Sequence, residues 1–237
     1  MNDTIPQLIS DLVLANHILA NENVLDAFGH VSVRHPGDPD HFFLSGSRAP
    51  ELVSHDDIIE FGSSSEPVVQ RDQALYIERF IHGEIYRLRP DVQAICHHHA
   101  PAIMPFCISG RAVVPVYQHG AMLGQFVPLW DSRSEFGDTN LLVVDMVQGA
   151  SLARTLGPYS MVLMRHHGAT VIGNSLKELV FRAIAACRNA GFQLAASGFG
   201  SVEGLTPGEI EKASKVSPGA IDRAWMQYES RLPVRRF

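Results

Sequence analysis

Cysteine is scarce in this sequence, and its spacing excludes several kinds of site. The three cysteines, Cys96, Cys107 and Cys187, are odd in number, and no two of them form a Cys-x-x-Cys pair. A disulfide framework and a thiolate zinc site are therefore not expected. Cys96 borders a run of histidines, but a small apolar side chain at the end of a buried strand explains it better than a nucleophile does.

Charge and long apolar runs are also limited. Charged residues make up 19% of the chain, the formal net charge is −6, and the lysines and arginines are scattered rather than gathered in a stripe. Such a chain is a poor partner for nucleic acid or an anionic membrane, so we expect a small-molecule substrate. No stretch approaches the ~20 apolar residues of a membrane span. The first residues lack a basic region followed by an apolar core, and we expect a cytoplasmic protein.

What the sequence does contain is an alternation of helical and strand patterns. Apolar residues recur at helical spacing in 6–22, 73–88 and 146–156, and capping residues open further helices at Ser175 and Thr206. Short apolar runs predict strands within 28–34, 42–44, 92–96, 113–117, 126–130, 141–144, 161–165 and 169–172.

Several of these strands are joined too tightly for helical crossovers, which predicts an α/β fold with a mixed sheet. The polar, serine-rich stretch 51–73 is expected to be surface loop. A chain of 237 residues can bury one large core, and no linker interrupts it. We therefore predict a single domain, 1–237, with a C-terminal helical tail.

The run His97-His98-His99 follows the apolar segment 92–96 and is the strongest functional signal. Imidazoles are costly to bury and seldom needed for packing, so three in a row suggest a metal. Because side chains alternate along a strand, His97 and His99 should point to one side and His98 to the other. A second apolar strand, 161–165, also leads into histidine, at His166-His167.

A catalytic metal site usually has three protein ligands and an open position. His97, His99 and His167 supply three, and Glu78 is the candidate for a nearby carboxylate because its helix leads into the strand that carries the histidine run. Imidazole ligands favour zinc, manganese, iron or cobalt over calcium or magnesium. His82 is expected to orient Glu78 or a backbone group rather than to bind the metal. His119 is equally compatible with a place in the pocket and a structural role.

The spaced motifs resemble a known family. Gly29-His30-Val31-Ser32, Glu78-x-x-x-His82, His97-x-His99-x-Pro101 and His167-Gly168 look like the class II aldolases of the fuculose-phosphate and ribulose-phosphate type, together with the adducin head domain. The match runs in order over about residues 8 to 195. It implies a three-layer α/β/α sandwich around a mixed, mostly antiparallel sheet. It also implies one divalent ion per subunit on His97, His99 and His167.

In the resembled family, Glu78 would be a fourth ligand or an acid/base. The resemblance further implies a cyclic homotetramer with active sites between subunits. Manganese or zinc is the expected metal, with cobalt as a third candidate. Tyr117 is a candidate proton donor that would act across a subunit interface.

The departures from the aldolase pattern concern the phosphate site. The sugar-phosphate aldolases have Gly-Asn-x-Ser at the glycine turn and a Ser-Ser pair before the glutamate. This chain has His30 in place of the asparagine, and Tyr76 and Ile77 in place of the two serines. The segment Ser45-Gly46-Ser47 is compatible with part of an anion site. Arg48 and Arg34 suit a planar carboxylate at least as well as a phosphate. We therefore expect Arg48, Arg34, Ser47 and His119 to contact the substrate.

These departures are similar to the branch of the family that decarboxylates hydroxylated aromatic acids, such as 3-hydroxy-2-methylpyridine-4,5-dicarboxylate 4-decarboxylase. The leading hypothesis is a metal-dependent decarboxylase of a small hydroxylated pyridine or benzene dicarboxylate in a catabolic pathway. Glu78, His30 and Tyr117, in that order, are the candidates for the proton donor. The alternatives are an aldolase that cleaves a sugar phosphate or hydroxy acid, and a non-catalytic adducin-like interaction module.

Overall fold

The computed structural model describes residues 4–70 and 72–233 and folds around one seven-stranded sheet. The strands are β1 (His30–Arg34), β2 (Phe42–Ser45), β3 (Ile58–Phe61), β4 (Ala94–His98), β5 (Leu129–Trp130), β6 (Met161–Met164) and β7 (Gly168–Gly173). Their order is β3-β2-β1-β4-β7-β6-β5. All neighbouring pairs are antiparallel except β5 and β6, which run parallel. The predicted mixed, mostly antiparallel sheet is confirmed.

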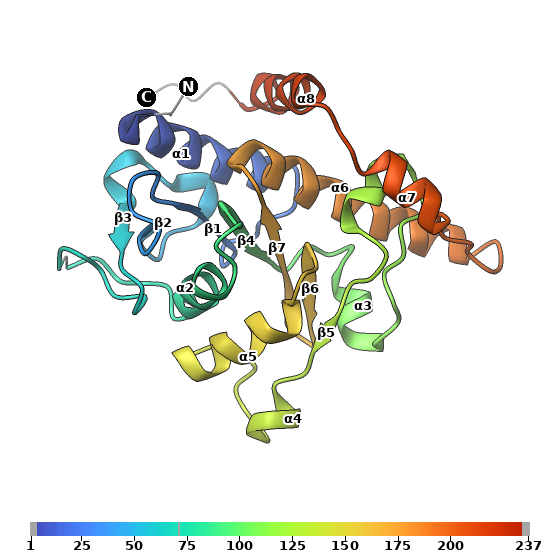
Figure 1. Ribbon diagram of the computed structural model, residues 1–237, viewed down its shortest axis with the longest axis horizontal. Coiled ribbons are helices and arrows are strands. Elements are labelled where there is room, and N and C mark those ends of the chain that lie inside the picture. Colours follow the sequence, from blue (N-terminus) through green and yellow to red (C-terminus); the bar gives the residue numbers. More distant parts are fainter. Residues whose placement is uncertain (1–3, 71, 234–237) are drawn as a thin grey trace.

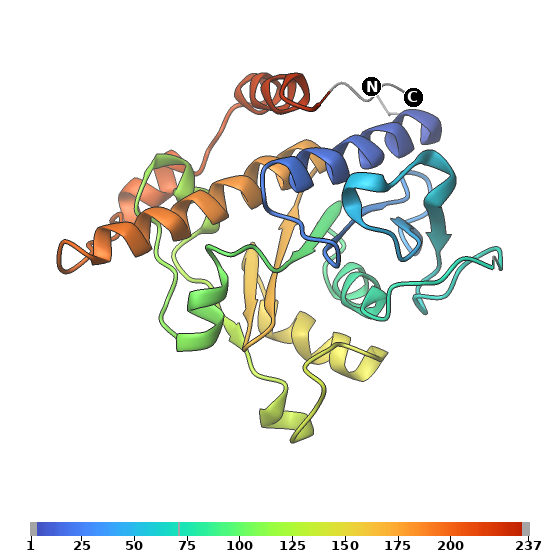
Figure 2. The ribbon, with the colours of Figure 1, turned by 180° about the vertical axis from the view of Figure 1, so that it is seen from behind.

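Helices cover both faces of the sheet, which confirms the three-layer sandwich (Figures 1 and 2). The helices are α1 (Ile5–Asn21), α2 (Arg79–Leu88), α3 (Met104–Ser109), α4 (Arg133–Phe136), α5 (Met146–Leu156), α6 (Leu176–Ser197), α7 (Pro207–Ala213) and α8 (Pro218–Ser230). Short 3-10 helices are η1 (Pro50–Leu52), η2 (His55–Asp57) and η3 (Gln118–Leu123). None of the described helices is long and apolar enough to cross a membrane.

The sheet separates two apolar cores. Helices α1 and α6 cover one face, where Val31 and Cys96 pack among their side chains. Helices α2 and α5 cover the other face, which carries Ile95 and Ile172. Cys96 is therefore a buried core residue beside the histidine run, as its position in a strand predicted. Successive residues of β4 alternate between the two cores, and this alternation decides which histidines can meet.

Local signals set most of the helix boundaries. The Ser175 side chain accepts a hydrogen bond from the Glu178 backbone N–H and begins α6, and Thr206 forms a reciprocal capping box with Glu209 at the start of α7. The predicted helix over 73–88 begins only at Arg79. Residues 73–78 instead form the loop that brings Glu78 to the sheet.

Several predicted strands are wrong. Residues 113–117 are irregular because side chains of α6 take their backbone hydrogen bonds: Asn189 Oδ1 accepts from Val116 and Gln193 Oε1 from Val114. Residues 141–144 form no strand, and only Leu129–Trp130 is strand within 126–130. The stretch 51–73, predicted as loop, contains β3.

Candidate metal centre

His97 lies in β4 and His99 follows the end of that strand. The side chains of both residues point to the α2–α5 side of the sheet. In the register of the sheet, His97 lies opposite His30 of β1 and Thr170 of β7. His98 points the other way, as strand alternation predicted. It is buried, and its Nδ1 accepts a hydrogen bond from the Ala100 backbone N–H at 3.3 Å. The pair of histidines two residues apart thus forms one side of a site.

His167 reaches the same place from the tight turn between β6 and β7. His166 has a φ of 58°, which lets the chain reverse. Gly168 follows, and a Cβ there would lie 2.4 Å from the His98 carbonyl oxygen, so only glycine fits this close approach. The turn therefore delivers His167 against the end of β4.

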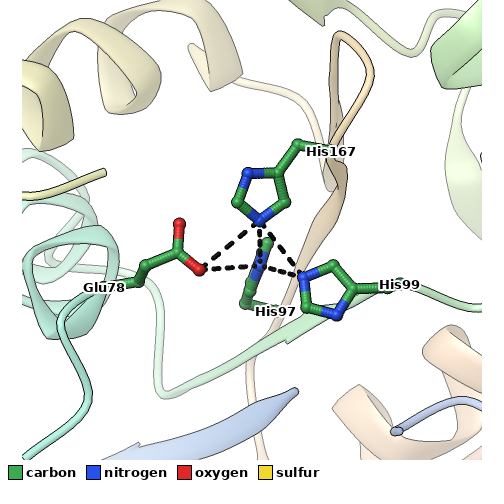
Figure 3. Close-up of side chains that lie close together, drawn as sticks. All are labelled: Glu78, His97, His99 and His167. Atoms are coloured by element: carbon green, nitrogen blue, oxygen red, sulfur yellow. Dashed lines mark hydrogen bonds and ion pairs between the residues drawn. The ribbon is translucent and has the colours of Figure 1, made fainter. Parts of the chain in front are cut away.

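Glu78 completes the cluster from the residue immediately before α2 (Figure 3). Its Oε1 accepts a hydrogen bond from the Val143 backbone N–H at 3.0 Å, which fixes the carboxylate. Its Oε2 lies 3.5 Å from His97 Nε2 and 3.4 Å from His167 Nε2. The three Nε2 atoms lie 3.0 Å apart for His97 and His99, and 3.2 Å apart for each pair that includes His167.

In each of the three histidines Nδ1 carries the ring hydrogen and donates it to a partner. Each Nε2 therefore presents a lone pair to the cluster. His167 Nδ1–H donates to the Leu141 carbonyl at 2.6 Å, and His99 Nδ1–H donates to the Asp26 carboxylate at 3.1 Å. The Thr170 hydroxyl donates to the Met164 sulfur, so its oxygen accepts from His97 Nδ1–H at 3.3 Å. Such partners fix the tautomer and ring orientation of a metal ligand.

Three converging lone pairs repel one another unless a cation lies between them. Nitrogens bound tetrahedrally to zinc at about 2.0–2.1 Å lie about 3.3–3.4 Å apart, close to the spacing seen here. Burial holds the pKa of His97 well below its usual value, and the neighbouring imidazoles lower that pKa further. His97 is therefore neutral near pH 7, as a ligand must be. The donor set fits a divalent ion, and Glu78, His97, His99 and His167 could hold one.

A cavity of about 550 Å³ opens next to the cluster, bordered by Glu78 and His99. His30, Ser47 and Arg48 contribute polar groups to its wall. The remaining wall is largely apolar; its lining residues are Ala27, Phe28, Ala49, Leu75, Tyr76, Ile77 and Leu142. The Arg48 Nε–H donates to the Leu52 carbonyl at 2.8 Å and lies 3.4 Å from the Asp57 carboxylate, and the Arg48 side chain is 51% exposed.

Arg34 is not brought to this cavity. It lies four residues along β1 from His30, which is about 13 Å at ~3.3 Å per residue. Its guanidinium donates to the backbone carbonyls of Val92, Tyr86, Arg89 and Pro39. With these bonds made, Arg34 braces the loop around the end of α2, and the prediction that it contacts substrate has no support in its position.

Tyr117 and His119 also lie apart from the cluster of their own chain. The Tyr117 hydroxyl donates to the Ala185 carbonyl at 3.3 Å. The rings of Tyr117 and His119 pack edge to face against each other. His119 lines a second cavity, of about 520 Å³, together with Arg188 and Arg223. This cavity shares no lining residue with the first, so within one chain neither side chain is placed at the metal centre.

His82 does not orient Glu78, which is a correction to the sequence prediction. It lies within α2, fully buried, and its Nε2 is 2.6 Å from His30 Nδ1. Its Nδ1 is 2.6 Å from the Ser32 hydroxyl oxygen, which in turn is 2.8 Å from the Tyr86 hydroxyl. His82 therefore holds His30, a residue of the cavity wall.

Asp26 is the residue that sequence reasoning missed. Its carboxylate accepts hydrogen bonds from the backbone N–H groups of Phe28 and Gly29 as well as from His99. Burial raises the pKa of Asp26, but its hydrogen bonds with His99, Phe28 and Gly29 outweigh burial and lower that pKa overall. The available signal was the Asp-x-x-Gly spacing, which is typical of a turn closed by an aspartate side chain.

Comparison with known proteins agrees with this geometry. Residues 10–194 match the family described as Class II Aldolase and Adducin N-terminal domain. The chain belongs to this family. It is similar to Decarboxylase tropJ of Talaromyces stipitatus, with 37% identity over 88% of each chain. It is also similar to Decarboxylase NovR of Streptomyces niveus, with 26% identity over 85% of this chain and 73% of the other.

A solved structure shares the fold. The L-fuculose 1-phosphate aldolase from Glaciozyma antarctica superposes with a TM-score of 0.78 at 22% identity, covering 95% of this chain and 88% of that one. At this identity the likeness establishes the architecture of the sheet and its helices. The resemblance noted from the spaced motifs is thereby confirmed for both family and fold.

Proposed function

We propose that this protein is a divalent-metal-dependent decarboxylase of a small hydroxylated aromatic dicarboxylate, with a pyridine or benzene ring. The observation that carries the proposal is the cavity beside the cluster, whose largely apolar wall carries one arginine, Arg48. Apolar walls suit a flat ring, and an arginine suits a carboxylate. Similarity to two proteins named as decarboxylases supports a lyase of this kind.

The chain's own residues would divide the work of the reaction. Arg48 would pair with a carboxylate of the substrate and orient the ring. Bound at Glu78, His97, His99 and His167, a divalent ion would withdraw the negative charge that develops beside the breaking bond. When carbon dioxide leaves, the electron pair stays on the ring carbon, which then takes a proton. Glu78 and His30 border the cavity and are the candidates to deliver it.

The donor set supports manganese or zinc as the metal, with cobalt as a third candidate. Three imidazoles and one carboxylate are unsuited to calcium or magnesium, which prefer oxygen ligands. We assign one ion to each subunit.

A homotetramer with active sites between subunits is the proposed assembly. The positions of Tyr117 and His119 support it, because both lie away from the metal centre of their own chain. In that assembly they would face the cavity of a neighbouring copy, and Tyr117 would remain a candidate proton donor there. Sedimentation of the full chain is expected to give four copies per particle.

Aldol cleavage of a sugar phosphate is the alternative function, and the shared fold with an aldolase favours it. The cavity wall argues against it, since His30, Tyr76 and Ile77 stand where the aldolase pattern has phosphate ligands. A non-catalytic adducin-like module is disfavoured because the four potential ligands are all in place.

The test is a panel of hydroxylated benzene and pyridine mono- and dicarboxylates, assayed for carbon dioxide release with manganese, zinc or cobalt, and again after chelation. We expect metal-dependent release from at least one dicarboxylate. Arg48→Met should raise KM about 10–100-fold, the loss that follows removal of a charge-assisted pair. The exposed Arg133→Met is the matched control and should leave KM unchanged.

Two outcomes would contradict the proposal. Carbon dioxide release from none of the acids, with stoichiometric metal bound, would count against a decarboxylase. Turnover of a ketose phosphate by the same metal-loaded protein would place the aldolase first.

A further inference from the structure

A chain of four buried polar side chains ends at the wall of the metal-centre cavity. It runs from Tyr86 through Ser32 and His82 to His30, with heavy-atom separations of 2.8, 2.6 and 2.6 Å. All four side chains are at most 5% exposed. His30 borders the cavity, and its Nε2, the last atom of the chain, is buried and has no hydrogen-bond partner among the described residues. We call these residues the Tyr86–His30 chain.

The direction of the hydrogen bonds follows from counting donors and acceptors. Among the residues that the structure describes, the only acceptor for the Tyr86 hydroxyl hydrogen is Ser32 Oγ. Ser32 then turns its own hydrogen to its other partner, His82 Nδ1. A hydroxyl has one hydrogen to donate, so each choice fixes the next one.

Counting donors and acceptors in the same way also fixes the positions of the hydrogens on His82 and His30. Burial lowers the pKa of His82 to about 3, so the ring is neutral near pH 7 and carries one hydrogen. With Nδ1 accepting from Ser32, that hydrogen is on Nε2 and is donated to His30 Nδ1. Because His30 Nδ1 accepts this hydrogen, it carries none of its own. His30 therefore carries its single hydrogen on Nε2.

We propose that Ser32 and His82, with Tyr86 setting the direction, are positioning residues that fix His30 as the tautomer whose Nε2–H points into the cavity, where it donates a hydrogen bond to an anionic oxygen of the substrate. The identity of the acceptor rests on the proposed function; the tautomer does not. An imidazole held in this way is a neutral hydrogen-bond donor rather than an acid or a base, so of the two candidates on the cavity wall Glu78 would deliver the proton to the ring carbon. It complements Arg48 on the same wall and selects for acids with a carboxylate or phenolate oxygen at this point.

The first test is neutron diffraction from deuterium-exchanged crystals of the full chain. Deuterium is expected on Nε2 of both His30 and His82, with both Nδ1 atoms bare. Deuterium on His30 Nδ1 would overturn the assignment. This measurement needs neither substrate nor turnover, so it stands apart from any failure of the decarboxylase proposal.

The second test reverses the hydrogen bond between residue 82 and His30 in the Tyr86–His30 chain. In His82→Glu the carboxylate can only accept, so His30 must donate from Nδ1 and present a lone pair to the cavity. In His82→Gln the amide can still donate to His30 and accept from Ser32. Titration of the manganese-loaded protein with 2-hydroxybenzoate should show at least 10-fold weaker binding for His82→Glu and a change under 3-fold for His82→Gln. Manganese affinity should be the same in both variants.

Equal binding of 2-hydroxybenzoate by His82→Glu and the unmodified protein would overturn the role of the tautomer in binding acids. Failure of the unmodified protein to bind 2-hydroxybenzoate would overturn the choice of acceptor. Ser32→Ala provides a second variant should His82→Glu not fold. It removes the donor to His82 Nδ1 and should weaken binding severalfold with manganese affinity unchanged, and unaltered binding would again overturn the proposal.

Discussion

At the scale of single residues, each imidazole of the cluster is controlled by what its Nδ1 touches. The Nδ1–H group donates to a threonine hydroxyl in His97, to an aspartate carboxylate in His99 and to a backbone carbonyl in His167. Asp26 is the charged member of this group, and its side chain is 47% exposed. Its negative charge would make His99 a stronger donor to a bound cation, as carboxylate partners do for metal-binding histidines.

We expect Asp26→Asn to weaken metal binding by about 10–100-fold. The amide oxygen can still accept from Phe28 and Gly29, so the turn is kept while the charge is lost. Competition with a chelator of known affinity measures the change. Asp222→Asn on α8 removes a surface carboxylate paired with Lys177 and is the matched control. Equal metal affinity in both variants would contradict the role given to Asp26.

The sequence could predict the clustered histidines better than the residues that support them. His97, His99 and His167 stand at the ends of apolar strands, and strand alternation separates them from His98. Asp26 carries no such pattern, because its approach to His99 depends on how the turn before β1 closes. His82 was assigned to the wrong partner for a similar reason: helical spacing places it near Glu78 along the chain, whereas α2 turns its ring toward β1.

At the scale of elements, the β6–β7 hairpin and β4 must lie in unusually close contact. The hairpin packs its turn onto the end of β4, and Gly168 is the point of contact. Elements that pair through their own backbones, such as these, were predicted from apolar patterns. The strand predicted over 113–117 does not form, because the side-chain amides of Asn189 and Gln193 take the place of a strand partner. No local pattern reports that a distant side chain will do this.

We expect Gly168→Ala to disturb the metal centre and lower the free energy of unfolding by about 1–3 kcal/mol, the usual effect of overpacking. Its Cβ would lie 2.4 Å from the His98 carbonyl oxygen and 2.8 Å from His99 Cδ2, so β4 and β7 must separate. Urea unfolding and metal titration measure the two effects.

Gly191→Ala on α6 is the matched control. Apart from its chain neighbours and the backbone of its own helix, no atom of the described residues lies within 4 Å of a Cβ built there, and the position is helical. Alanine should therefore stabilise the protein by about 0.5–1 kcal/mol. If Gly168→Ala bound metal as tightly as Gly191→Ala, the close contact would not be what holds His99 and His167 together.

At the scale of the whole molecule, one face of the sheet, the face covered by α2 and α5, carries both of the polar networks described above. The cluster and the Tyr86–His30 chain both lie there, within a layer that otherwise packs aromatic and aliphatic side chains. His82 is fully buried between α2 and the sheet, facing His30 and Ser32 of β1 and the Phe42 ring of β2. Burying neutral imidazole in this layer links the stability of the molecule to pH.

The sign of that link follows from the pKa of His82. The ring has a pKa near 6.5 in the unfolded chain and about 3 in the folded one. Between these values the unfolded state binds one more proton than the folded state, so lowering the pH favours unfolding. Above about pH 6.5 both states are neutral, and His82 adds no pH dependence.

We therefore expect the free energy of unfolding to fall by up to about 1.4 kcal/mol per pH unit from His82 alone as the pH is lowered from 6 to 4. Urea unfolding at each pH measures this slope. His82→Gln has no group to protonate and should show a shallower curve by that amount, whereas His55→Gln, which removes an exposed histidine, should keep the slope of the unmodified protein. Parallel curves for all three proteins would mean that His82 takes up its proton in the folded state, and that the α2 layer admits a charge which its packing is expected to exclude.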